Sequence, residues 1–207
     1  MMITLRVSVM MKSLPPAMGV DRICGPTGHQ LVRGAPCGAL RCQYPAPSLN
    51  QTWDREMDIT ELVTATRIVA LKKEKTKDAA LKTLVRCLAK TEFVAKEKEL
   101  AKAISDRERI LSTGIGQGIA IPHAKIPSVS GFVAALGISQ DGIPFDSLDG
   151  RPAHVIVMIA GPEGQNEEYL RILARFTGTL KPEETRNRII DAAKKADQVL
   201  GILAEVT

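Results

Sequence analysis

A run of five large apolar residues, Val155-Ile156-Val157-Met158-Ile159, constrains the fold of this chain more than any other feature. A strand with one face in water alternates apolar and polar residues, whereas a continuous apolar run is typical of a strand buried on both faces. Such a strand needs a covering layer on each side, and helices supply that layer where helical segments flank the strands. The run therefore predicts a sheet in the middle of its domain.

The segments around this run have the periods of strands and helices. Thr76 is a candidate N-cap for a helix with apolar residues at i, i+3, i+4 and i+7. Those residues are Leu81, Leu84, Val85 and Leu88. A second helix is predicted over 96–107, and later helices begin at Asn166 (as an N-cap), Pro182 and Ala196. The other predicted strands are Ile68–Leu71, Ile119–Ile121 and Phe132–Ile138. Strands bounded by helices on both sides predict an α/β sandwich.

Residues 1–56 differ in character from residues 57–207. Glycine and proline interrupt the first segment so often that neither a helical nor a strand period continues. We expect an irregular, disordered leader over 1–56 and one domain over 57–207, and the abrupt change at Met57 suggests that translation starts there. The leader also holds a histidine and three cysteines whose spacing matches no compact zinc site, so no metal is expected there. These residues are Cys24, His29, Cys37 and Cys42.

Composition excludes several classes of protein. The 207 residues include 28 basic residues (Lys and Arg) and 23 acidic residues (Asp and Glu). Six of the basic and three of the acidic residues lie in residues 1–56, so residues 57–207 hold 22 basic and 20 acidic residues. A nearly balanced domain lacks the basic surface of a nucleic-acid binder, and 3% aromatic residues are too few for base stacking. No segment approaches the roughly 20 apolar residues of a membrane span. The domain has one cysteine, Cys87, and no disulfide framework, which favours the cytoplasm.

One segment combines glycines, a proline and a histidine in a pattern that suggests chemistry. Three glycines stand at alternate positions, and a short apolar strand then leads through Pro122 to His123. Glycine lets the backbone turn its N–H groups toward an anion, and an imidazole beside such groups can accept a phosphoryl group. From spacing alone, a purely structural turn with a capping histidine stays open. The predicted phosphate-binding loop consists of Thr113, Gly114, Gly116 and Gly118, with positive charge from Arg107, Arg109 and Lys125.

This segment resembles the active-site signature of the enzyme IIA (EIIA) domains of the bacterial phosphotransferase system (PTS), in the fructose, mannitol and nitrogen-regulatory class (type 2). The matching stretches read Arg107-Glu108, Ser112-Thr113-Gly114-Ile115-Gly116 and Ile119-Ala120-Ile121-Pro122-His123. The resemblance covers about residues 57–207 and implies a mixed β-sheet between α-helices. It also implies that His123 is the phosphoryl acceptor, that Arg107 stabilises the phosphate, and that no cofactor is needed.

The same resemblance implies protein partners for the phosphoryl group. The donor is the histidine phosphocarrier HPr or a paralogue, and the acceptor is an enzyme IIB (EIIB) domain or a regulated protein. We expect the nitrogen-regulatory role, because no IIB or IIC segment accompanies the domain in this sequence. A sugar-specific role, with a separate EIIB of the fructose or mannitol type, stays open.

One position departs from the family pattern. Many members carry a second histidine where this chain has Tyr169. A tyrosine hydroxyl can hydrogen-bond His123 or a phosphate oxygen, but it carries no positive charge at neutral pH. Two alternatives stay open: that Tyr169 belongs to the apolar stripe of its helix, and that the chain is a binding module with this fold and no catalysis. His154, which precedes the buried run, is a weaker candidate for function.

Overall fold

The structure is a computed structural model that describes residues 58–206. The predictions for residues 1–56 and for Met57, including the start of the domain, lie outside the described residues. From residue 58 to residue 206 the chain folds as the predicted α/β domain. No helix in this range is long and apolar enough to cross a membrane.

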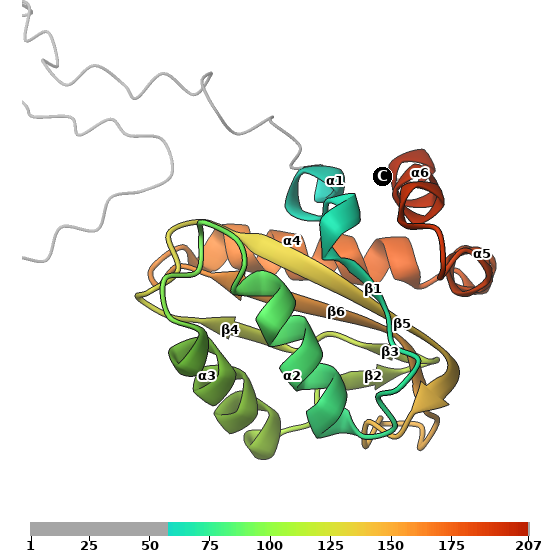
Figure 1. Ribbon diagram of the computed structural model, residues 1–207, viewed down its shortest axis with the longest axis horizontal. Coiled ribbons are helices and arrows are strands. Elements are labelled where there is room, and N and C mark those ends of the chain that lie inside the picture. Colours follow the sequence, from blue (N-terminus) through green and yellow to red (C-terminus); the bar gives the residue numbers. More distant parts are fainter. Residues whose placement is uncertain (1–57, 207) are drawn as a thin grey trace, which may run out of the picture. The chain divides into compact units, whose positions relative to one another are not determined.

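Six strands of the described chain form one mixed sheet (Figure 1). They are β1 Ile68–Ala70, β2 Gly114–Gly116, β3 Ile119–Ala120, β4 His123–Lys125, β5 Val133–Ile143 and β6 Ala153–Gly161. The order is β1-β5-β6-β3-β2, and β4 also pairs with β6. Strands β5 and β6 are antiparallel, whereas β3 and β4 both run parallel to β6 and β1 runs parallel to β5. The mixed sheet is thus confirmed.

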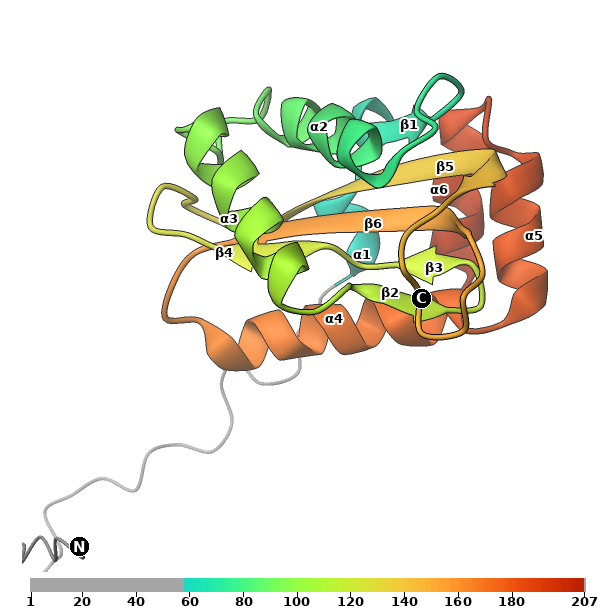
Figure 2. The same cartoon turned by 90° about the horizontal axis from the view of Figure 1, so that it is seen from below.

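Helices cover both faces of this sheet, as Figure 2 shows. On one face lie α2 Lys77–Leu88 and α3 Glu97–Ile110; the other elements are α1 Ile59–Leu62, a 3₁₀ turn Ala65–Arg67, α4 Asn166–Leu180, α5 Glu183–Asp191 and α6 Ala196–Glu205. The buried residues form two clusters, one containing α2 and α3 and the other containing α1, α4, α5 and α6. The predicted sandwich is therefore confirmed.

Strand β6 contributes to both clusters. Its alternate residues Val155, Val157 and Ile159 pack in the cluster with α4, whereas Ile156 and Met158 pack in the cluster with α2. All five side chains are fully buried. Because successive side chains of a strand point to opposite faces, a continuous apolar run is what a central strand between two layers requires.

Helix α2 begins where the sequence predicts. The hydroxyl of Thr76 accepts a hydrogen bond of 3.3 Å from the backbone N–H of Ala79, which satisfies one unpaired donor of the first turn. Its four predicted core residues are all buried. Burial of an aliphatic side chain stabilises the fold by roughly 1.5–3 kcal/mol relative to exposure, so this face of α2 is held by packing.

One local prediction is wrong. Asn166 is not an N-cap: Gln165 precedes α4, and Asn166 is the first helical residue, its side-chain oxygen accepting a hydrogen bond from Lys125. His123 lies at a strand end, as predicted, and this end is the first residue of a separate strand, β4. Pro122, which has no N–H to donate, interrupts the ladder between β3 and β4.

Candidate active site

His123 is held by the backbone on both sides. It pairs in register with Ile159 of the buried strand, and the carbonyl of Pro122 accepts a hydrogen bond of 3.0 Å from the N–H of Ile159. The Nδ1 atom of the ring lies 2.6 Å from the carbonyl oxygen of Ile121. A carbonyl oxygen can only accept, so Nδ1 carries the hydrogen, and Nε2 of the neutral ring holds the free lone pair.

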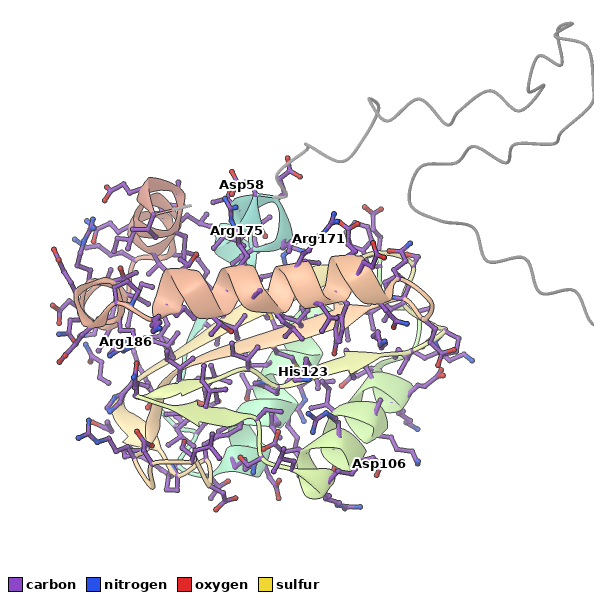
Figure 3. All side chains as sticks on the ribbon, turned by 180° about the vertical axis from the view of Figure 1, so that it is seen from behind. Asp58, Asp106, His123, Arg171, Arg175 and Arg186 are labelled. Carbon is purple, nitrogen blue, oxygen red and sulfur yellow. The ribbon has the colours of Figure 1, made fainter. Side chains whose placement is uncertain are left out.

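The ring opens into a small cavity of about 290 Å³. Helix α3 supplies Ala103 and Arg107, which are four residues apart and therefore share a face. Lys125 follows His123 by two residues on β4, and Tyr169 comes from the first turn of α4. Figure 3 shows His123 in the sheet beneath α4. The cavity thus brings together a histidine, two cations and a phenol from three elements.

Tyr169 forms one wall of this cavity. Its ring meets the His123 ring edge to face, with the centroids 5.7 Å apart and the planes at 69°, and it stacks on Phe132 at 6.4 Å. Only 7% of its surface is exposed. Burial raises the pKa of Tyr169 to about 12, despite the opposing charge of Arg107. The hydroxyl therefore keeps its proton at neutral pH.

The surroundings of His123 favour the neutral imidazole. Burial lowers the pKa of the ring most, and the positive charge of Arg107 lowers it further. The hydrogen bond to Ile121 and the charge of Glu108 act in the opposite direction but do not reverse the shift. A neutral ring is the form that can act as a nucleophile.

Two cations border the cavity. Arg107 lies in the last turn of α3, and its Nη1 donates to the carbonyl of Leu111 at 3.2 Å. The Lys125 ammonium lies 5.1 Å from the centroid of the Tyr169 ring and donates to Asn166. Both are half-buried, where the attraction between a cation and a phosphate is stronger than in water. The site can therefore hold a phosphoryl group on His123.

A buried carboxylate beside Arg107 supports the site, and the sequence interpretation gave it no role. Glu108 accepts hydrogen bonds from the N–H of Thr113 at 3.0 Å and from its hydroxyl at 2.5 Å. It also pairs with Lys77 of α2 at 2.7 Å. Burial lowers the pKa of Lys77, but hydrogen bonds to Glu108 and Asp146 outweigh burial and raise it. This network ties the end of α3 to the loop that follows and to α2.

The predicted phosphate-binding loop is not assembled around His123. Both donors of Thr113 are bonded to Glu108, and Gly118 lines a different cavity. A Cβ on Gly114 would lie 2.6 Å from the Ser147 hydroxyl. Gly116 and Gly118 have φ angles of +90° and +79°, so glycine is needed there for the turn between β2 and β3. The turn lies beside the start of β6, where the carbonyl of Gly118 accepts hydrogen bonds from the N–H groups of His154 and Val155, whereas His123 pairs with Ile159 farther along that strand.

Two weaker candidates also lie elsewhere. Arg109 is exposed, pairs with Asp106 at 3.7 Å and lines a groove between α2 and α3. His154 donates from Nδ1 to the carbonyl of Ser139 at 3.0 Å and lines the cavity that Gly118 lines. Within residues 58–206, no group of three or more His, Cys, Asp or Glu side chains can hold a metal ion.

The glycine turn can be tested separately from phosphoryl transfer. We expect Gly116→Ala to destabilise the protein by about 1–2 kcal/mol, because an L side chain in the left-handed region is strained, while the folded variant accepts phosphate at the wild-type rate. Gly178→Ala is the matched control: it lies inside α4 in open space, so a gain of about 0.5–1 kcal/mol is expected. Chemical denaturation measures both. Slow phosphate uptake by a folded Gly116→Ala protein would show that the glycine turn does contribute to the phosphate site.

Comparison with known proteins places this geometry in one family. The family described as "Phosphoenolpyruvate-dependent sugar phosphotransferase system, EIIA 2" matches residues 61–206. The fructose-specific EIIA component of Haloferax volcanii is 34% identical over 153 residues, which cover 72% of this chain and 99% of that protein. The fructose-specific EIIABC component of Bacillus subtilis is 40% identical over 147 residues, or 71% of this chain. That match spans only 23% of the longer relative.

Solved structures agree with this assignment. The nitrogen regulatory protein IIA-Ntr of Neisseria meningitidis superposes with a TM-score of 0.62 and 25% identity, covering 70% of this chain and 98% of that one. The mannitol enzyme IIA of Escherichia coli, solved in complex with phosphorylated enzyme IIB, has the same fold at a TM-score of 0.60 and 24% identity, covering 69% of this chain and 97% of that one. The chain is related to both sugar-specific and nitrogen-regulatory proteins, and it belongs to the EIIA type 2 family of the phosphoenolpyruvate-dependent phosphotransferase system.

Proposed function

We propose that this chain is a phosphocarrier of the cytoplasm in which His123 accepts a phosphoryl group from HPr or a paralogue and then transfers it or signals with it. One observation carries the proposal: the Nδ1 hydrogen bond to the Ile121 carbonyl leaves Nε2 as the free nitrogen in a cavity shared with Arg107. The donor and the acceptor are inferred from the family.

The transfer step follows from this hydrogen bond. The Nε2 lone pair of His123 attacks the phosphorus of a phosphohistidine on the donor, and a P–N bond forms while the P–N bond to the donor breaks. The donor ring takes back that electron pair. The Nδ1 proton stays on His123, where the Ile121 carbonyl stabilises the positive charge that the ring gains.

Arg107 and Lys125 supply charge for the phosphate. Both line the cavity of His123, and the guanidinium is the better match for phosphate oxygens because its donors are planar and always protonated. The carbonyl of Leu111 holds one arm of Arg107 in place. We infer that Arg107 stabilises the phosphoryl group, with Lys125 as a second point charge.

The ionisation of His123 gives a direct prediction. We expect the ring to titrate below its ordinary value of about 6.5, because burial and Arg107 both disfavour the charged form. Phosphate uptake therefore stays constant as the pH falls from neutrality to that value, and declines only at more acid pH. Ring ¹⁵N–¹H correlations measure the midpoint and the tautomer, with His123→Ala as the assignment control. A midpoint at or above 6.5, or a hydrogen on Nε2, would contradict the mechanism.

Tyr169 is a positioning candidate at the family's second-histidine position. Its proton is retained, so we infer that the hydroxyl donates a hydrogen bond to a phosphate oxygen on His123. Tyr169→Phe keeps the ring contacts and removes only this donor. The half-life of the phosphorylated protein should fall roughly tenfold, the equivalent of one hydrogen bond of about 1.4 kcal/mol, with little change in stability. An unchanged half-life assigns Tyr169 to the core alone.

Intact-mass analysis tests the proposed function. The protein is incubated with phosphoenolpyruvate, enzyme I and HPr, and one acid-labile phosphate on His123 is the expected result. No added phosphate on a folded protein with active donors would overturn the proposal and favour a binding module without catalysis.

The acceptor is the second question. The regulatory role is our expectation from the sequence, whereas the identities of 40% and 34% to fructose-specific proteins support a sugar-type EIIB as acceptor. The phosphorylated protein is mixed with a purified fructose-type EIIB, and transfer of the phosphoryl group is measured. In parallel, the phosphorylated and the unphosphorylated forms of this protein are each used as bait in pull-downs. Rapid transfer to EIIB supports the sugar-specific role; a partner that binds only one phosphorylation state, without transfer, supports the regulatory role.

A further inference from the structure

A second cavity of about 600 Å³ lies at the other end of the sheet from His123. Its walls come from the turn before β3, the start of β6, and the junction of α4 and α5. His154 on β6 stands five residues before Ile159, the register partner of His123. At about 3.3 Å per residue, the two sites are roughly 16 Å apart along the strand. Figure 3 shows Arg186, on the α5 side of this cavity, beyond the end of α4 and apart from His123.

The charges of this cavity are unbalanced. Arg151, Lys181 and Arg186 line it, and the one acidic side chain among the lining residues is Glu183. Many cations elsewhere in the domain are paired, such as Lys77 with Glu108. Within residues 58–206, by contrast, no carboxylate forms an ion pair with the three cavity cations. Asp149 accepts hydrogen bonds from the backbone N–H groups of Gln117 and Arg151, and its charge interacts with that of Arg151 without direct pairing. The lining residues thus carry a net charge of about +2, and an anion is the group that would neutralise it.

Arg186 is a fixed part of the cavity wall. The residue is only 9% exposed, and its Nη1 donates to the carbonyls of Leu180, at 3.0 Å, and Lys181 at the end of α4. These bonds use one arm of a guanidinium that has five N–H donors in a planar fork. The arginine is therefore held in position before any ligand arrives, which reduces the entropy lost on binding.

Further polar groups complete the lining. The Nδ1–H of His154 is directed at the Ser139 carbonyl, which leaves Nε2 for a ligand. Gln140 and Asn187 add amide groups that can both donate and accept hydrogen bonds. A volume of 600 Å³ lies within the usual range of roughly 300–1,000 Å³ for small-molecule sites. Three cations and two amides among the lining residues suit a ligand with a phosphate and several hydroxyl groups.

We propose that this cavity is a second ligand site, separate from the phosphoryl-transfer site, and that it binds a small phosphorylated metabolite. A phosphate monoester carries a charge of about −1.5 to −2 at pH 7, which matches the net charge of the lining, whereas one carboxylate would leave a cation unmatched. Arg151, Lys181 and Arg186 hold the phosphate, and Gln140 and Asn187 bind the hydroxyl groups. Binding requires no phosphorylation of His123.

Glucose 6-phosphate serves as the probe, titrated into the ¹⁵N-labelled full chain, with glucose as the uncharged control. We expect saturable shifts of the backbone amides of Gly118, Arg151 and Asn187 that glucose does not produce and that persist in His123→Ala. Glu183→Gln, which removes the single opposing charge, should tighten binding roughly threefold.

A double variant provides the decisive comparison. Arg151→Gln with Lys181→Gln should weaken binding at least tenfold, or by about 1.4 kcal/mol or more, because two charge-assisted contacts are lost. Lys90→Gln with Lys98→Gln removes the same charge from exposed positions near α2 and α3 and should leave the affinity unchanged. The proposal is overturned if the probe does not bind, if the double variant binds as the wild type does, or if the shifts cluster around His123 and Lys125.

Discussion

Replacement of His123 by alanine is expected to abolish phosphate uptake and leave the domain folded. Nε2 is the nucleophile, and neither Arg107 nor Lys125 has a lone pair at neutral pH to replace it. The ring is half-buried, with one hydrogen bond to a carbonyl and one edge contact to Tyr169. Its loss should lower the free energy of unfolding by only about 1–2 kcal/mol.

The measurement is intact mass after incubation with phosphoenolpyruvate, enzyme I and HPr, combined with urea unfolding. His154→Ala is the matched control, because His154 is the other histidine of the described domain and lies in a separate cavity. It should take up phosphate as the wild type does. Phosphate on folded His123→Ala protein, or loss of uptake in folded His154→Ala protein, would refute the assignment.

Glu108→Ala is expected to produce the largest loss of stability, about 3–4 kcal/mol. The carboxylate is 8% exposed and serves three donors, two from Thr113 and one from Lys77. Removal of one partner of a buried pair leaves the others without compensation, and the desolvation cost of those donors is then unmatched. Asp146, which pairs with Lys77 at 3.0 Å, offsets part of that cost.

Two further variants separate charge from hydrogen bonding at this position. Glu108→Gln keeps an acceptor for Thr113 and removes the charge, so a smaller loss of about 1–2 kcal/mol is expected. Glu92→Ala, at an exposed site, should change stability by less than about 0.5 kcal/mol. Urea unfolding at neutral pH provides all three values. Equal losses for Glu108→Ala and Glu92→Ala would show that the network contributes nothing.

Local patterns were sufficient to predict most of the fold. The apolar run at 155–159, the helix after Thr76 and the strand at Ile68–Leu71 each depend on residues that are close in sequence. Strands β2 and β4 were missed because Gly-Ile-Gly and His-Ala-Lys contain no run of β-branched apolar residues, unlike the predicted strands at β1 and β3. The cap at Asn166 was wrong because Lys125, distant in sequence, bonds its side chain.

The candidate active site, like the fold, was predictable from the sequence only in part. The amino-acid sequence by itself was enough to propose His123 and Arg107 as site residues, because a histidine after a proline, in a segment with the family signature, can be recognised without coordinates. Only the tertiary structure decided which ring nitrogen is free, that Tyr169 forms a wall beside it, and that the glycine turn lies elsewhere. Glu108 acquires its role from Lys77, which another helix brings to it. Periodicity and motifs depend on residues that are close together in the sequence. A site, by contrast, depends on sheet register and on helix packing between segments that are distant in the sequence.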